Sequence, residues 1–197
     1  MEMPPPAAGK PQVNIATSVA KVPTSSKDDA DAVARPGDDE PPKSHCKPSE
    51  STLFSCMLDD SHRTISLCLS HAGEPGAKAY FVSGSIGAAD ASIPVEGDAA
   101  PGFFQRTPLV LAGGTGGYAY SFEQSGQVQI LYSISGENGL ERHGRMLADT
   151  DVSTAATDNS CSPGTVLESD DIEVLKEVRR WPKQPRLAKN GLPPVDP

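Results

Sequence analysis

The glycine run Gly113-Gly114-Thr115-Gly116-Gly117 is the segment of this sequence closest to a known chemical motif. A phosphate-binding loop ends in Gly-Lys-Ser/Thr, and a dinucleotide-binding loop lies between a strand and a helix. The run has neither feature, because Tyr118-Ala119-Tyr120 behind it has the pattern of a strand. We therefore predict a loop between two strands, whose bare backbone could enter the cleft of a partner.

The residues that could do catalysis do not form a recognisable set. Ser83-Gly84-Ser85-Ile86-Gly87 has the wrong spacing for the Gly-x-Ser-x-Gly nucleophile elbow. Asp59 with Asp60 and Glu137 with Glu141 are possible carboxylate pairs, but loop acids in an acidic chain are usually solvated. We expect that the protein is not an enzyme and has no cofactor.

Two short segments have residue types suited to partner contact. Glu141-Arg142-His143 lies between two predicted strands and is either a polar recognition patch or a solvated turn. Arg179-Arg180-Trp181 has the types enriched at interface hot spots, although Trp181 packing on its own domain is the favoured alternative. The predicted partner-binding residues are Gly114, Thr115, Gly116, Tyr118, Tyr120, Glu141 and Arg142.

The four cysteines, Cys46, Cys56, Cys68 and Cys161, are compatible with two disulfides. Disulfides imply an oxidising compartment, and we expect the periplasm; free buried thiols are the alternative. The cysteines form no C-x-x-C pair, and the four histidines lack zinc spacing, so no metal site is expected.

The first strands predict how the cysteines pair. Residues 53–58 and 64–70 read as a hairpin around the turn residues 59–62. A register symmetric about His62 would place Cys56 opposite Cys68, but it would also set apolar residues against the polar row of the second strand. Cys56 should therefore point inward and Cys68 outward. We predict Cys46–Cys68 with Cys56–Cys161, out of three possible connectivities.

Further short apolar segments, with Gly, Asp or Pro between them, indicate a mainly β protein. The expected strands are 79–82, 92–95, 108–111, 118–122, 128–134 and 145–148, and the pair 118–122 with 128–134 should form a second hairpin. Pro94 and Pro108 should lie at strand ends or edges. This pattern is typical of a small antiparallel barrel or sandwich, which we place in residues 46–168.

The two ends differ from this β domain, because nine of the 19 prolines lie in residues 1–48 and five in 182–197. Residues 1–45 read as a disordered tether with no aromatic residue. Residues 169–182 predict one C-terminal amphipathic helix, capped by Ser169 or Asp170 and ended by Pro182. Residues 183–197 read as an extended Pro-rich tail.

The formal charge of −9 is concentrated in residues 46–168, which have six basic and 14 acidic side chains. An acidic domain argues against nucleic acid and suits a basic protein partner, unless the charge serves only solubility. No apolar run is long enough for a transmembrane helix. Met1-Glu2-Met3-Pro4 lacks the pattern of a signal peptide. The cysteine usage nevertheless favours a mature region with an added start codon, whose precursor could have a lipid anchor.

The segments Phe54-x-Cys56, Ile65-Ser66-Leu67-Cys68, Gly117-Tyr118-x-Tyr120 and Leu140-Glu141-x-x-Gly144, with the late Cys161, resemble small cysteine-stapled secreted proteins of proteobacteria. More distantly, they are similar to periplasmic inhibitors of C-type lysozyme and to toxin-immunity proteins. The resemblance covers roughly residues 51–161 and implies a small β domain closed by a disulfide. The lysozyme-inhibitor pattern has no second cysteine pair, no acidic N-terminal segment and no C-terminal helix.

These observations favour a periplasmic inhibitor or immunity protein that blocks a secreted toxin enzyme, such as a lipase or a peptidoglycan hydrolase. The alternatives are a lysozyme inhibitor and a structural or accessory protein of the cell envelope.

Overall fold

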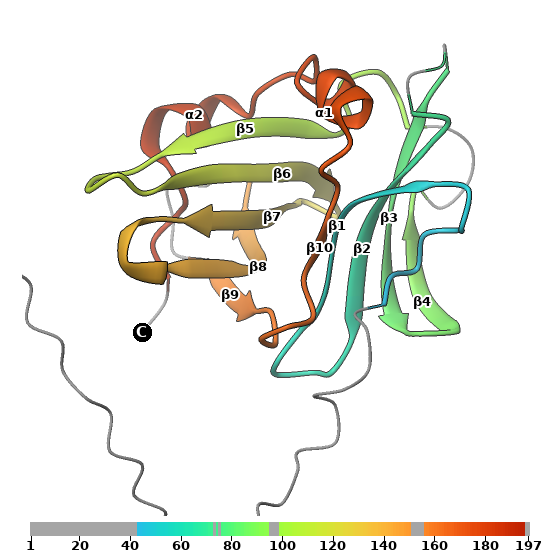
Figure 1. Cartoon of the computed structure of the whole chain (residues 1–197), viewed down its shortest axis with the longest axis horizontal. Coiled ribbons are helices and arrows are strands. Elements are labelled where there is room, and N and C mark those ends of the chain that lie inside the picture. Colours follow the sequence, from blue (N-terminus) through green and yellow to red (C-terminus); the bar gives the residue numbers. More distant parts are fainter. Residues whose placement is uncertain (1–42, 73, 75, 95–98, 151–155, 196–197) are drawn as a thin grey trace, which may run out of the picture. The chain divides into compact units, whose positions relative to one another are not determined.

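The computed structural model describes residues 43–72, 74, 76–94, 99–150 and 156–195, and shows a mainly β domain with two antiparallel sheets (Figure 1). In sheet 1 the order is β10-β1-β2-β3-β4, with β1 Ser51–Met57, β2 Thr64–Ser70, β3 Lys78–Ser85, β4 Ala88–Ile93 and β10 Leu167–Glu168. In sheet 2 the order is β5-β6-β7-β8-β9, with β5 Gln105–Val110, β6 Gly116–Gln124, β7 Gln127–Ser135, β8 Glu141–Asp149 and β9 Thr157–Ser160. The sheets do not close into a barrel. Of the two predicted architectures, the sandwich is the one that fits.

The hairpin of β1 and β2 has the register that the alternation of its side chains requires. Cys56 pairs with Ile65 and Phe54 with Leu67, so the apolar side chains of both strands share one face. An irregularity between Thr52 and Phe54 then sets Thr52 opposite Cys68. Cys56 and Cys68 therefore do not face each other, as predicted.

The two disulfides have the predicted pairing. Cys46 is joined to Cys68 across 22 residues, and Cys56 to Cys161 across 105 residues. Cys56 lies in the core, whereas Cys68 points to the other face of sheet 1. Two disulfides are typical of proteins from an oxidising compartment.

Sheet 2 contains the second predicted hairpin, formed by β6 and β7 around Ser125 and Gly126. Pro108 lies in β5, at the sheet edge where a missing backbone donor is tolerated. Pro94 directly follows the end of β4, and Val95, expected to end that strand, lies outside the described residues. Strands β9 and β10 were not predicted, because one is polar and the other has two residues; both exist by pairing with longer neighbours.

The main core lies between the sheets. Phe54, Leu67 and Phe81 of sheet 1 pack against Tyr120, Phe122 and Leu131 of sheet 2. Phe81 and Phe122 have ring centroids 5.1 Å apart. The ring centroid of Trp181 lies 6.0 Å from that of Phe104 and 5.9 Å from that of Tyr120. This confirms that Trp181 packs on its own domain.

The C-terminal region has two short helices, where the sequence predicted one helix and an extended tail. Helix α1 spans Ile172–Val178, shorter than the predicted 169–182, and Asp171 rather than Ser169 or Asp170 caps it by accepting from two backbone N–H groups. Helix α2, Pro185–Asn190, forms inside the predicted tail. Pro185 occupies its first turn, where no backbone donor is needed, and Gln184 caps it.

Helix α2 covers the second face of sheet 2. Its Leu187 is 1% exposed and belongs to a separate apolar cluster with Tyr132, Ile130 and Leu109. This burial stabilises a helix that proline content alone argued against. No described helix is long and apolar enough to cross a membrane.

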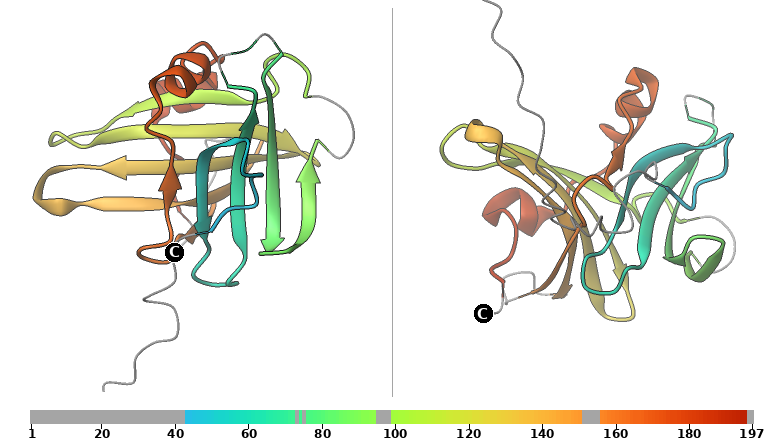
Figure 2. Two further views of the ribbon diagram at one scale, coloured as in Figure 1. Left: turned by 45° about the vertical axis from the view of Figure 1, so that its right-hand side comes forward. Right: turned by 60° about the horizontal axis from the view of Figure 1, so that its bottom comes forward.

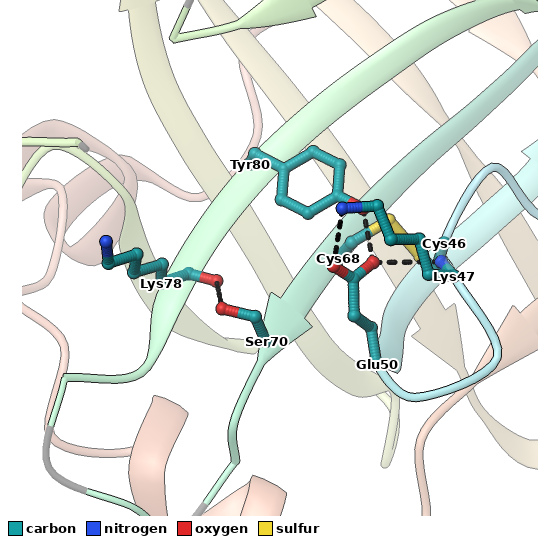
Figure 3. Close-up of polar contacts among 7 residues, drawn as sticks. All are labelled: Cys46, Lys47, Glu50, Cys68, Ser70, Lys78 and Tyr80. Atoms are coloured by element: carbon teal, nitrogen blue, oxygen red, sulfur yellow. Dashed lines mark hydrogen bonds and ion pairs between the residues drawn. A yellow bond between two sulfur atoms is a disulfide. The ribbon is translucent and has the colours of Figure 1, made fainter. Parts of the chain in front are cut away.

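Residues 43–50 form a strap on the outer face of sheet 1, and residues 1–42 of the expected tether lie outside the described residues. The backbone N–H of His45 donates to Ser66 Oγ at 3.0 Å, so the assignment of residues 43–45 to the tether was wrong. Figure 3 shows Glu50 between Lys47 and Tyr80, beside the Cys46–Cys68 disulfide. The Tyr80 hydroxyl donates to Glu50, and burial followed by this bond raises the pKa of Tyr80.

The lengths of the two cross-linked loops predict their contributions to stability. Replacing Cys56 and Cys161 by Ala should lower the free energy of unfolding by about 4 to 5 kcal/mol, and replacing Cys46 and Cys68 by about 3 kcal/mol, because a longer loop restricts the unfolded chain more. Urea denaturation of both double variants measures the difference. Each pair includes one fully buried cysteine, so the packing losses are comparable. An equal or reversed order would contradict the prediction.

Candidate functional site

Sheet 2 projects beyond sheet 1 at the end formed by the β5–β6 and β7–β8 turns (Figures 1 and 2). The first turn contains Leu111–Thr115, in which Leu111 N–H donates to Thr115 O at 2.9 Å. The second contains the 3-10 turn Glu137–Gly139, and Gly136 N–H donates to Leu140 O at 2.9 Å. We call this projecting end the tip.

The two turns of the tip are in direct contact. A Cβ atom on Gly114 would lie 3.0 Å from the Glu137 carboxylate, and one on Gly136 would lie 2.6 Å from Thr115 Oγ1. Glycine at these positions therefore lets the turns pack side by side. The predicted inter-strand loop is confirmed, and its Thr115 is held against the neighbouring turn.

The tip exposes three apolar side chains. Val110 is 91% exposed, Leu140 is 42% exposed and Leu111 is 36% exposed. Val110 and Leu111 come from the end of β5, and Leu140 immediately precedes β8. Because neighbouring residues of a strand point to opposite faces, Val110 lies on one face of the sheet and Leu111 on the other, so the three side chains surround its end. We call these three side chains the apolar patch. Single exposed apolar residues are normal, but three at the end of two contacting hairpins have the character of an interface.

Most of the predicted partner-binding residues lie in or near the tip. Gly114 and Thr115 are in the first turn. Gly116 and Glu141 are aligned with Val110 in the cross-strand register, in what we call the same row of sheet 2. Tyr118 lies one row further in and is partly buried.

Two of the predicted residues do not belong to this surface. Tyr120 is only 2% exposed and packs in the core, because its row lies beneath sheet 1, so its prediction as a partner-binding residue was wrong. Arg142 lies on the opposite face of the sheet, where its Nη2 donates to Asp158 Oδ2 at 3.2 Å.

Asp158 also holds a buried tyrosine on this opposite face. The Tyr132 hydroxyl donates to Asp158 at 2.9 Å, and burial, then the Asp158 charge, raises the pKa of Tyr132 to about 12. A Cβ atom on Gly144 would lie 2.7 Å from the Tyr132 hydroxyl oxygen. Glycine at 144 thus leaves room for the Tyr132 hydroxyl. The charge of Arg142 is neutralised by its ion pair with Asp158.

On the inner face, four polar side chains meet where β10 crosses sheet 2. Arg106 of β5 places its guanidinium carbon 4.8 Å from the ring centroid of Tyr118. Burial raises the pKa of Tyr118, and the nearby Glu168 carboxylate of β10 adds to this. Glu168 Oε1 in turn lies 3.5 Å from His143 Nδ1 of β8. These contacts run continuously from β5 to β8, and we call the four residues the polar row, although Arg106 itself is paired with Tyr120 in the sheet.

Two nitrogens of this row are buried without a hydrogen-bond partner: Arg106 Nε and His143 Nδ1. In the described part of the chain, no other buried side-chain nitrogen or oxygen is left unpaired. Unpaired buried polar atoms cost free energy and are rare, so their concentration in one row marks it as a candidate site.

A pocket of about 420 Å³ opens beside His143. It is lined by Glu141, Arg142, His143, Val166 and residues 160–164. The row and the pocket together combine an imidazole, carboxylates and a tyrosine next to the apolar tip.

The arrangement does not assemble a Ser-His-Glu triad. Ser160 lines the pocket, but the register pairs it with Gly144 and so places it on the other face of the sheet from His143. Ser133 is the cross-strand neighbour of His143, yet the structure shows no hydrogen bond between the two in the described residues. A nucleophile activated by a base requires such a contact. The described residues also contain no group of three side chains suited to hold a metal ion.

Sequence reasoning missed Arg106 and Glu168. Arg106 precedes the expected strand 108–111, and Glu168 lies at the boundary assigned between the β domain and the helix. Neither has a local pattern of function, because only the pairing of β10 with β1 brings Glu168 over sheet 2. The one member of this site that the sequence pointed to was His143, as part of the polar segment Glu141-Arg142-His143 between two predicted strands.

No family model, curated protein or solved structure matches this chain.

The close approach of two strands at the tip predicts a strict glycine requirement. A Cβ atom on Gly117 would lie 1.9 Å from the Ser133 carbonyl oxygen, whereas one on Gly113 would contact nothing within 4 Å. Gly117→Ala should therefore lower the free energy of unfolding by about 3 kcal/mol or more, through a clash with backbone. Gly113→Ala should cost only about 1 to 2 kcal/mol, for its left-handed conformation. Thermal or urea unfolding compares them, and equal losses would contradict the predicted clash.

Proposed function

We propose that this protein is a periplasmic inhibitor or immunity protein that inserts its tip into the active-site cleft of a secreted enzyme. The enzyme would be a toxin of the lipase or peptidoglycan-hydrolase type. The observation that carries the proposal is the exposed apolar patch of Val110, Leu111 and Leu140 at the end of two contacting hairpins.

The geometry of the tip suits insertion. A narrow end of a sheet can enter a concave surface, and apolar side chains at its end would lose their contact with water there. The turns hold each other through Gly114 with Glu137 and Gly136 with Thr115. A surface that is ordered before binding loses less conformational entropy on association.

The charge and the disulfides support the compartment and the kind of partner. Glu137 and Glu141 flank the apolar patch, and Arg142 nearby is paired with Asp158. An acidic rim favours association with a basic enzyme through long-range attraction. Two disulfides favour a compartment such as the periplasm.

Substitution of the patch tests the proposal. The wild-type protein should capture a hydrolase from an extract of the host's cell envelope and inhibit the purified hydrolase at a one-to-one ratio. A variant with Val110→Asp and Leu140→Asp should bind this enzyme about 30-fold more weakly, because charged groups replace apolar contacts at the centre of the interface. Both residues are exposed, so the variant should keep the stability of the wild type.

Ile172→Asp is the matched control. Ile172 is an apolar residue that is 65% exposed, but it lies at the start of α1 rather than in the tip. This variant should capture and inhibit the enzyme like the wild type. If the tip variant also inhibits like the wild type, or if no captured enzyme is inhibited, the proposed function is wrong.

A further inference from the structure

We infer that the pocket beside His143 binds a basic side chain, arginine or lysine, of the partner protein. This inference rests on the proposed function and names the chemistry by which the inner face next to the tip would recognise its partner. Within the pocket, His143 Nε2 and the Glu141 carboxylate are the acceptors, and Glu168 is a positioning residue for the imidazole.

The first step is the tautomer of His143. Its Nδ1 is buried without a hydrogen-bond partner in the described residues, and the charged group beside it is Glu168, whose Oε1 lies 3.5 Å away. A carboxylate beside one ring nitrogen stabilises the tautomer with the proton on that nitrogen. The neutral ring then has its lone pair on Nε2.

The second step is the accessibility of this lone pair. His143 lines the pocket, and its Nε2 has no hydrogen-bond partner in the described residues and is not among the buried unpaired atoms. Nε2 is therefore open to a ligand. A neutral imidazole with an open lone pair accepts a hydrogen bond from an N–H group, and arginine and lysine side chains carry only donors.

The third step is the charge around the pocket. Glu141 lines it and is exposed, and Glu168 lies directly behind His143. The positive groups nearby are engaged, because Arg142 pairs with Asp158 and Arg106 lies over the Tyr118 ring. A cationic side chain in the pocket thus meets the Glu141 carboxylate, with Glu168 behind the ring, and Arg142, the cation among the described lining residues, is paired with Asp158. An anionic ligand would be repelled by the same groups.

The position relative to the tip makes the pocket part of one interface. Glu141 lies in the same row of sheet 2 as Val110, and His143 in the next row with Tyr118. A partner that buries the apolar patch would therefore also cover this face. The patch would provide apolar contact area, and the pocket would select for a basic group.

Nuclear magnetic resonance of the full chain tests the inference with a defined probe. Titration with Nα-acetyl-arginine amide at pH 7.5 should shift the His143 ring signals and the backbone signals of residues 141–143 and 160–164. The citrulline analogue has the same shape without the charge and should cause no such shifts.

Single substitutions separate the roles. Glu141→Gln, at an exposed position, should weaken binding of the arginine probe severalfold, and His143→Phe should also weaken it, because phenylalanine has no acceptor. Glu168→Gln should retain binding but shift the ring nitrogen signals of His143 that report its tautomer, because the ring loses the carboxylate that orients it. Glu123→Gln, an exposed glutamate at the far end of β6, is the matched control and should bind like the wild type.

The inference is overturned if the arginine and citrulline probes shift the same signals equally, or if neither binds. These outcomes leave the tip unaffected. The variant with Val110→Asp and Leu140→Asp should still bind the arginine probe, so a failure of the pocket and a failure of the proposed function are distinguishable.

Discussion

The Cys56–Cys161 disulfide holds the chain segment after β9 against both sheets. Cys161 bridges Leu58 at the end of β1, and its backbone N–H donates to His143 O of β8 at 2.9 Å. The chain must therefore leave sheet 2 at this point and return along β1 as β10. This path brings Glu168 over the inner face of sheet 2 and forms one wall of the pocket beside His143.

The path of β10 set by this disulfide also explains why the inner face of sheet 2 is buried at one end and exposed at the other. Where sheet 1 and the helix segment cover it, the inner face carries Tyr120, Phe122 and Leu131 and is fully buried. Next to this region, β10 partly covers Tyr118 and His143. Beyond β10 the side chains in the same alternation are Val110 and Glu141, which are exposed. The change from core to surface along one face gives the protein both its stability and its candidate interface.

Much of this fold could be predicted from the sequence because its determinants are local. The alternation in β1 and β2 predicted the side on which each cysteine lies, and hence both disulfides. The turn residues Ser125 and Gly126 predicted the second hairpin, and the glycine run predicted the first turn of the tip. The sequence did not reveal helix α2, because Pro185 reads as a breaker until its place in the first turn is known.

By itself, the sequence determined most of the strands, the inward faces of β1 and β2, the cysteine pairs and the acidic character of the domain. Period-two alternation and residue type are properties of neighbouring residues, so they can be read without the fold. Only the tertiary structure decided that Arg106, Tyr118, His143 and Glu168 form one row and that Tyr120 is buried. These residues come from four strands whose adjacency depends on the sheet order and on the covalent link at Cys161, and no local pattern encodes that adjacency.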